Sequence, residues 1–217
     1  MLPIGWERIY RRKGDLGFRV LPRIRRVSKE FRLKNYTRIL DLGCGTGKHS
    51  IYLAKQGFSV VASDIAPTGL DIAKNKAKSL GLNNIEFILH DMRSIPLGND
   101  HIDGVICIWV IHHGTLEDIK TTIYEIHRIL KPGGMVITDL SSVDTGSYGI
   151  GKEIECNTFV GGKKDEEDVP HHFTTRKELT RLFSPFQQHR IRLCTRLYID
   201  QAGRKHFSKK LHVKAVK

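Results

Sequence analysis

Three glycines and an aspartate crowd into one short stretch of the chain. Residues 39–47 read ILDLGCGTG, so Gly43, Gly45 and Gly47 follow an apolar run that also carries Asp41. Bare backbone between a strand and a helix lets a ligand lie against the N–H groups at the N-terminus of the helix. The spacing therefore predicts a ligand-binding loop, and the neighbouring carboxylate indicates a ligand that carries positive charge.

Two classes of ligand bind at loops of this kind, dinucleotides and adenosyl compounds such as S-adenosylmethionine. The dinucleotide fingerprint G-x-G-x-x-G needs a third glycine at the position where this chain has Lys48. Asp41 would repel the negative charges of a pyrophosphate, whereas it would attract the ammonium and sulfonium groups of S-adenosylmethionine. The charge argument therefore favours the sulfonium ligand.

Alternating apolar segments predict the elements that would position this loop. Helical spacing of apolar residues is clearest over 116–130, and Gly57 and Gly81 would end two earlier helices. Strands that alternate with helices of this length form parallel β-α-β units. We expect strands at 38–40, 58–64, 85–91, 104–110 and 135–140, and helices at 49–56, 66–81 and 116–130. This order predicts an α/β, Rossmann-like, doubly wound and mostly parallel seven-stranded sheet with helices on both faces.

The last third of the chain differs in kind. A polar stretch from 141 to about 172 carries the acidic cluster 165–168, and it exceeds ordinary loop lengths, so it is either functional or partly structured. The next segment predicts a helix with Thr174 or Thr175 as N-cap and Glu178 completing a capping box. Segments 187–199 and 209–217 alternate well enough to form an antiparallel pair of strands at the edge of the sheet.

Four motifs in this order resemble the class I S-adenosylmethionine-dependent methyltransferases over residues 36–140. They are the glycine loop, an acidic residue ending the second strand, an aspartate after the third, and RILKPGG before the fifth. The resemblance implies that the three glycines line the methionine part and that Asp41 lies near the ammonium group. It further implies cofactor contacts to the ribose, the adenine and the sulfonium side from Asp64, Ile65, Asp91, Met92, Ile108 and Trp109. Three of these residues have another interpretation, since Asp64 and Asp91 could each cap a turn, and Trp109 could belong to the core.

The chemistry that the resemblance implies is a direct in-line displacement at the sulfonium methyl group. A base is needed only if the acceptor arrives protonated, and histidine suits that role because its pKa is near neutrality. The candidates are His112 and His113 after the fourth strand, and His171 and His172 at the end of the long loop. Each pair could instead lie on a loop at the surface. Two adjacent pairs far apart in sequence are weak evidence for a metal, so no metal site is predicted.

The acceptor has two interpretations. The segment WERIYRRKGDLGF is similar to the lid of small-molecule methyltransferases of the tellurite-resistance and ubiquinone types, with Trp6 or Tyr10 closing over the cofactor. IWVIHH occurs in those enzymes and also in tRNA wobble-uridine methyltransferases. We predict a small-molecule acceptor, with tRNA as the alternative and a non-catalytic nucleotide- or RNA-binding scaffold as a second alternative.

Charge is distributed unevenly along the chain. The net charge of +13 divides into +9 for residues 1–38 (12 basic, 3 acidic), +8 for residues 186–217 (9 basic, 1 acidic) and −4 between them. The basic ends could be solvated surface, or they could draw an anionic acceptor or nucleic acid to a positive face.

Length and composition suggest one domain of 217 residues. We expect an N-terminal lid and helices (1–36), a cofactor-binding core (37–140), and an acceptor-side loop with terminal strands (141–217). The sequence has no apolar run of about 20 residues, the length that a transmembrane helix requires. Its first residues lack the apolar stretch of a secretory signal. The four cysteines show no Cys-x-x-Cys spacing. We therefore expect a cytoplasmic monomer or homodimer with no membrane partner.

Overall fold

A computed structural model describes residues 4–17, 19–199 and 205–217, so residues 1–3 and 18 of the expected lid and 200–204 lie outside the described residues. The helices are α1 (Ile4–Lys13), α2 (Pro22–Leu33), α3 (Lys48–Lys55), α4 (Pro67–Ser79), α5 (Leu116–Ile129) and α6 (Arg176–Leu182). The strands are β1 (Arg38–Leu42), β2 (Ser59–Asp64), β3 (Ile85–Leu89), β4 (Ile102–Cys107), β5 (Leu130–Ser142), β6 (Lys152–Glu155), β7 (Thr158–Val160), β8 (His171–Thr174), β9 (Gln188–Ile199) and β10 (Lys205–Val216). Among these helices, none is both long enough and apolar enough to cross a bilayer.

The main sheet has the predicted doubly wound order. Strands β3, β2, β1, β4 and β5 lie side by side and run parallel, β10 pairs antiparallel with β5, and β9 pairs antiparallel with β10. These seven strands confirm the mostly parallel sheet with an antiparallel edge. Chain order reverses at β1, which has β2 on one side and β4 on the other. A ligand crevice is expected outside the carboxyl ends of the strands at such a switch point.

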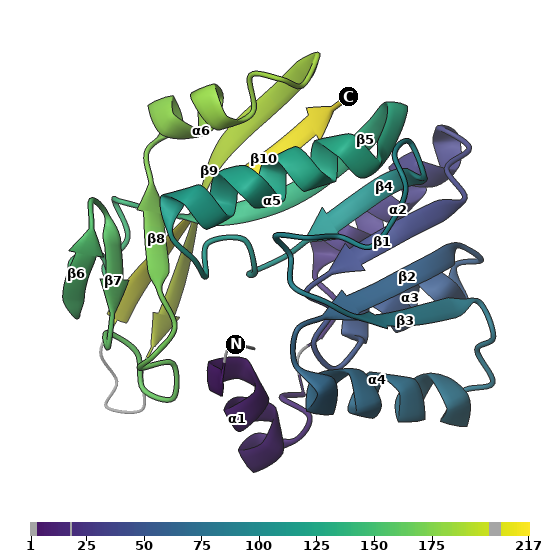
Figure 1. Ribbon diagram of the computed structural model, residues 1–217, viewed down its shortest axis with the longest axis horizontal. Helices are drawn as coiled ribbons and strands as arrows, with labels where there is room; N and C mark the ends of the chain where they lie inside the picture. The colour runs from purple at the N-terminus through teal and green to yellow at the C-terminus, as the bar shows by residue number, and fades with distance from the viewer. Residues whose placement is uncertain (1–3, 18, 200–204) are drawn as a thin grey trace.

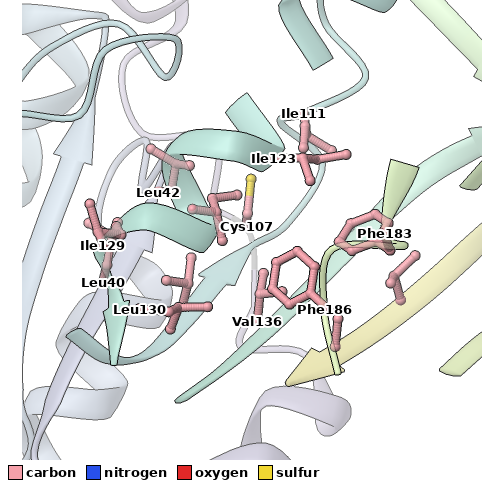
Figure 2. Close-up of a cluster of buried hydrophobic side chains, with 14 of the residues drawn as sticks. Leu40, Leu42, Cys107, Ile111, Ile123, Ile129, Leu130, Val136, Phe183 and Phe186 are labelled. Atoms are coloured by element: carbon pink, nitrogen blue, oxygen red, sulfur yellow. The ribbon is translucent and has the colours of Figure 1, made fainter. Parts of the chain in front are cut away.

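Helices cover both faces of this sheet, as Figure 1 shows. Side chains of α2 and α3 pack with alternate residues of the strands, among them Ile39, Val60 and Ile106. On the other face, α5 and α6 cover the cluster drawn in Figure 2, where Leu40, Val136 and Phe183 are fully buried. The predicted stripe of α5 supplies Ile119, Ile123 and Ile126 to this second cluster. Burying each such side chain stabilises the fold by about 1.5–3 kcal/mol.

The long polar stretch is more structured than the sequence analysis predicted. Strands β6, β7 and β8 form a small antiparallel sheet that joins the end of β5 through Ser141 and Ser142 (Figure 1). Thr175 caps α6 as expected, because its hydroxyl accepts the Glu178 N–H at 3.1 Å. The Glu178 carboxylate, however, lies 3.3 Å from His172 Nε2. Glu178, which was expected to complete a capping box, therefore contacts a residue outside the helix with its side chain.

Candidate functional site

The glycine loop lies against a cavity of about 480 Å³ at the switch point of the sheet. Gly43, Gly45 and Gly47 all have positive φ, between 55° and 80°, which explains the need for glycine. A Cβ at Gly45 would lie 2.5 Å from the Tyr10 hydroxyl oxygen, so the packing of helix α1 also requires a bare backbone there. Gly43 and Gly45 line the cavity, whereas Gly47 does not; it is the N-cap of α3.

Asp64 ends β2 with its carboxylate at the cavity wall. One oxygen accepts the Gly45 N–H at 2.8 Å and the other accepts the Ala66 N–H at 2.9 Å, so Asp64 holds the loop and the turn before α4. A carboxylate has about four acceptor positions, so roughly two remain for a ligand. A ribose diol, which offers two hydroxyl donors, fits that capacity. Burial raises the pKa of Asp64, against the effect of these backbone hydrogen bonds.

A second observation fits a polar ligand in this cavity. His49, in the first turn of α3, lines the cavity although it is only 4% exposed. Its Nε2 is buried and has no hydrogen-bond partner among the described residues. Burial, reinforced by Lys48, lowers the pKa of His49 to about 3, so the ring is uncharged near neutral pH. Sequence analysis missed this residue, because the motif 39–47 ends two positions before it.

Asp91 and Met92 line the same cavity beyond β3. Asp91 is engaged locally: Oδ1 accepts the backbone N–H and Nε–H of Arg93, each at 2.9 Å, and Oδ2 accepts from Nη2 at 2.5 Å. Burial opposes ionisation of Asp91, but the Arg93 hydrogen bonds outweigh it and hold the pKa below its usual value. Asp91 therefore caps a local turn, as the alternative interpretation predicted, and it also faces the cavity.

Asp41 lies beneath the glycine loop and not in the cavity wall. It is 2% exposed, and Oδ2 accepts the Ser50 hydroxyl at 2.5 Å. Burial raises its pKa to about 6, despite the opposing effects of Ser50 and Lys48. An ammonium group in the cavity would therefore feel its charge through the loop.

Trp109 lies two residues beyond the end of β4, which stops at Cys107, three residues earlier than the predicted strand 104–110. Its φ is +63°, an unfavourable value for a residue with a side chain, and its N–H donates to Asp139 Oδ1 at 2.7 Å. Asp139 is fully buried and is ion-paired with Arg23 of α2. Ile108 and Trp109 both line the cavity, and Lys48 Nζ lies 4.8 Å from the centre of the Trp109 ring. Sequence analysis did not identify Asp139, although an acid within the apolar strand VITDL is an available signal.

Helix α1 forms part of the cavity wall, and it lies beside α4 (Figure 1). Trp6 and Tyr10 line the cavity, and Glu7 accepts the Thr68 N–H at 3.0 Å and its hydroxyl at 2.7 Å. The acidic cluster 165–168 holds the outer side of the helix through ion pairs that include Arg8 with Asp168 at 2.8 Å. Charge complementarity between α1 and this cluster therefore helps to position the helix.

A second cavity of about 680 Å³ adjoins the first. Trp6, Leu16, Trp109 and His113 line both. Its wall is strongly basic and brings together the two basic ends of the chain, with cations at Lys13, Arg23, Arg26, Lys163, Lys164, Arg196 and Lys210 against Asp165 and Glu166. Residues from the two ends, which lie more than a hundred positions apart in the sequence, therefore line the same cavity.

The candidate histidines occupy different places. His113 lines both cavities, while His112 is 1% exposed directly behind it. Burial lowers the pKa of both rings well below the usual value, with neighbouring Lys210 and His171 adding to the effect. His172 lines neither cavity: its Nδ1 lies 2.7 Å from the Thr158 hydroxyl oxygen and its side chain is fully buried. Because side chains alternate along β8, His171 faces His112 and His113, with ring centroids 6.3 Å and 4.9 Å away, and His172 faces away from them.

Comparison with known proteins places residues 39–134 in a family described as a methyltransferase domain. A putative methyltransferase of Bacillus subtilis (strain 168), YqeM, is 33% identical over 145 residues, covering 66% of this chain and 56% of that protein. The ubiquinone biosynthesis O-methyltransferase of Rickettsia felis is 30% identical over 148 residues, covering 63% of this chain and 58% of that protein. The chain spans about half the length of the curated relatives it matches.

Solved structures show the same fold. A protein from Methanosarcina mazei, described as an S-adenosylmethionine-dependent methyltransferase, aligns with a TM-score of 0.68 over 91% of this chain and 98% of that one. Sequence identity in that alignment is 23%, so the likeness is one of fold.

Proposed function

We propose that this chain, which belongs to the class I S-adenosylmethionine-dependent methyltransferases, transfers a methyl group from S-adenosylmethionine to a small anionic acceptor. The cavity at the glycine loop would hold the cofactor, and the adjoining basic cavity would hold the acceptor. One observation carries the proposal: the two cavities share a wall, and cations from both ends of the chain line the second. The relative named for ubiquinone biosynthesis supports a small-molecule acceptor.

Bound S-adenosylmethionine would supply an electrophilic methyl group on a sulfonium. The protein's contribution to a direct displacement is mainly proximity, alignment and exclusion of water. Asp64, itself held by the Gly45 N–H, would orient the cofactor at one end of its cavity, and Trp6 and Trp109 would form the apolar wall facing the acceptor. Helix α1 would exclude water, because Tyr10 lies directly over the glycine loop and is 8% exposed.

His113 is the histidine best placed to receive a proton from the acceptor. It lines both cavities, and its ring packs against Trp6 with centroids 5.1 Å apart. A lowered pKa keeps its imidazole uncharged at neutral pH, so a lone pair is available. His112 is enclosed behind it and would act through His113, while His172 has no access to either cavity.

Calorimetry tests the cofactor half of the proposal. We expect binding of S-adenosylmethionine and its demethylated product, and none of NAD. Asp64→Ala is expected to weaken cofactor binding by about 2–3 kcal/mol, because ribose hydroxyls lose a charged acceptor. Asp71→Ala is the matched control, since Asp71 is an exposed acid on α4. Micromolar NAD binding without any S-adenosylmethionine binding would refute the assignment.

A methyl-transfer screen tests the acceptor half. Small carboxylates and phosphates, uncharged analogues and bulk tRNA are incubated with methyl-labelled cofactor. We expect label in an anionic small molecule, and a loss of its binding in Arg26→Gln but not in Arg25→Gln, where Arg25 lies 5.1 Å from the Tyr52 ring centre. The tRNA alternative instead predicts an affinity that falls roughly a hundredfold or more between 50 and 200 mM salt. Binding of tRNA weaker than about 100 μM at low salt would exclude that alternative.

A further inference from the structure

Three histidine rings gather at the wall shared by the two cavities. His112 and His113 follow β4 and His171 begins β8, so the cluster joins segments that are far apart in sequence. One ring nitrogen from each histidine lies within 4.8 Å of those from the other two. Glu166 Oε2 lies 2.9 Å from His171 Nε2 and 3.9 Å from His113 Nε2. Three imidazoles and a carboxylate thus converge on one small volume.

Three buried ring nitrogens of this cluster lack a hydrogen-bond partner among the residues that the structure describes. They are Nδ1 of His112 and both ring nitrogens of His171. Glu166 approaches His171 at contact distance but without hydrogen-bond geometry. His112 is 1% exposed and His171 is 4% exposed. An unpaired buried polar group costs about 1–3 kcal/mol, so several of them facing each other indicate a missing partner.

We propose that His112, His113, His171 and Glu166 form a binding site for a divalent transition-metal ion, with zinc as the ion that fits best. Imidazole nitrogens suit zinc, copper, iron and nickel, whereas magnesium and calcium take oxygen ligands. Three nitrogens and one carboxylate oxygen match a tetrahedral zinc site. This inference goes beyond the proposed methyl transfer and does not depend on it.

The geometry requires a modest contraction. Zinc–nitrogen bonds of about 2.0–2.1 Å place tetrahedral ligand atoms roughly 3.3 Å apart. The most separated nitrogens would therefore approach by roughly 1.5 Å from their present 4.8 Å. Glu166 lies in the loop before β8 and His171 is the first residue of that strand, so side-chain rotation at both positions disturbs little of the sheet.

Two lysines oppose a cation at this place. Lys163 Nζ lies 3.5 Å from Glu166 Oε2, which it would have to release to the ion. Lys210 Nζ lies 3.1 Å from His112 Nε2 and donates to the Ser141 hydroxyl at 2.9 Å. That contact leaves Nδ1 as the free nitrogen of His112, and it places a positive charge beside the site. Lys210→Met is therefore expected to tighten zinc binding. Unchanged affinity in that variant would place the ion away from His112 and overturn the proposal.

A metal at this wall would change the part that His113 plays. A nitrogen that binds zinc has no lone pair left to accept a proton. Because the three histidines and Glu166 would fill all four tetrahedral positions, the ion would be structural and would tie the segment before β8 to the segment after β4. Occupancy of the cluster therefore decides whether His113 can accept a proton from an acceptor.

Metal titration of the chelator-treated protein tests the site without cofactor or acceptor. Zinc chloride is titrated by calorimetry, and cobalt chloride by visible absorption, whose intensity separates four-coordinate from six-coordinate ions. We expect one equivalent of zinc, a four-coordinate cobalt spectrum and no binding of magnesium at the same concentrations. His171→Ala and Glu166→Gln should each weaken zinc binding tenfold or more, since even indirect partners of a metal ligand contribute about 10–100-fold.

Two control variants locate the ion. His101→Ala removes an exposed histidine outside the cluster and should leave zinc affinity unchanged. Cys194→Ser tests a thiol–imidazole pair that lines the basic cavity. In this pair Cys194 Sγ lies 3.1 Å from His212 Nδ1. Zinc binding that survives His171→Ala and disappears in Cys194→Ser would assign the ion to that pair and overturn the proposal. Absence of saturable zinc binding by the folded parent protein would also overturn it, whatever the outcome for S-adenosylmethionine.

Discussion

The buried ion pair beneath Trp109 offers a direct test of how the two cavities are held together. Asp139 is fully buried, accepts the Trp109 N–H at 2.7 Å and pairs with Arg23, which is 14% exposed. Asp139→Asn keeps the shape of the side chain and removes its charge. An amide offers one acceptor and one donor group, so if its oxygen stays with Trp109, an N–H group faces the guanidinium.

The expected loss of stability follows from this burial. Removing one partner of a buried ion pair costs about 3–5 kcal/mol, because the other charge is left uncompensated. Arg23 retains some exposure, which favours the lower end, about 3 kcal/mol. Nε and Nη1 of Arg23 already lack hydrogen-bond partners among the described residues, so little can compensate locally. For a chain of this length, about 3 kcal/mol corresponds to a fall in Tm of roughly 6–12 °C.

Urea denaturation and thermal scanning of Asp139→Asn, Arg23→Met and the double variant measure the effect. The double variant should lose less than the sum of the single variants, because it leaves no unpaired charge. Asp100→Asn is the control, since Asp100 forms an exposed ion pair with Lys217 and should change stability by about 1 kcal/mol or less. Tryptophan fluorescence reports whether the strained turn relaxes. A loss below about 1 kcal/mol with unchanged fluorescence would refute the argument that Asp139 holds Trp109 and Arg23 together.

Two further predictions concern the lid and the buried aspartate. The double variant Asp165→Asn, Asp168→Asn should show faster hydrogen exchange in residues 4–13 and weaker cofactor binding at low salt, because both acids form ion pairs with α1. Equal exchange rates in parent and variant at low salt would contradict this. Near 1 M salt, where the Debye length is about 3 Å, the difference should disappear. Because the pKa of Asp41 is raised to about 6 from an ordinary 3.8, the folded protein binds the proton more tightly than the unfolded chain, and stability is lost as pH rises through this interval. The free energy of unfolding of Asp41→Asn, measured by denaturation, should therefore rise by about 2–3 kcal/mol relative to the parent between about pH 4 and pH 7.5. Its cofactor affinity should fall. A stability difference that does not change with pH would show that Asp41 is not buried in its charged form.

Local patterns in the sequence were sufficient to predict the sheet and one cavity. Strand and helix periods are properties of neighbouring residues, so the α5 stripe and the parallel strands could be identified without tertiary contacts. The glycine loop could also be predicted from the sequence, because the positive φ at Gly43 and Gly45 favours glycine at those positions. Asp64 follows from the same register, since it ends the strand beside that loop.

Tertiary structure alone decided the contents of the wall between the cavities. His113 and His171 are separated by 57 intervening residues and meet because β8 pairs with the end of β5, a contact that no periodicity encodes. His172 is turned away by the alternation of a strand that was not predicted. The basic ends meet for a related reason: α2 packs against the sheet beside the antiparallel pair β9 and β10, so Arg23 and Lys210 face one cavity although composition could only count their charges.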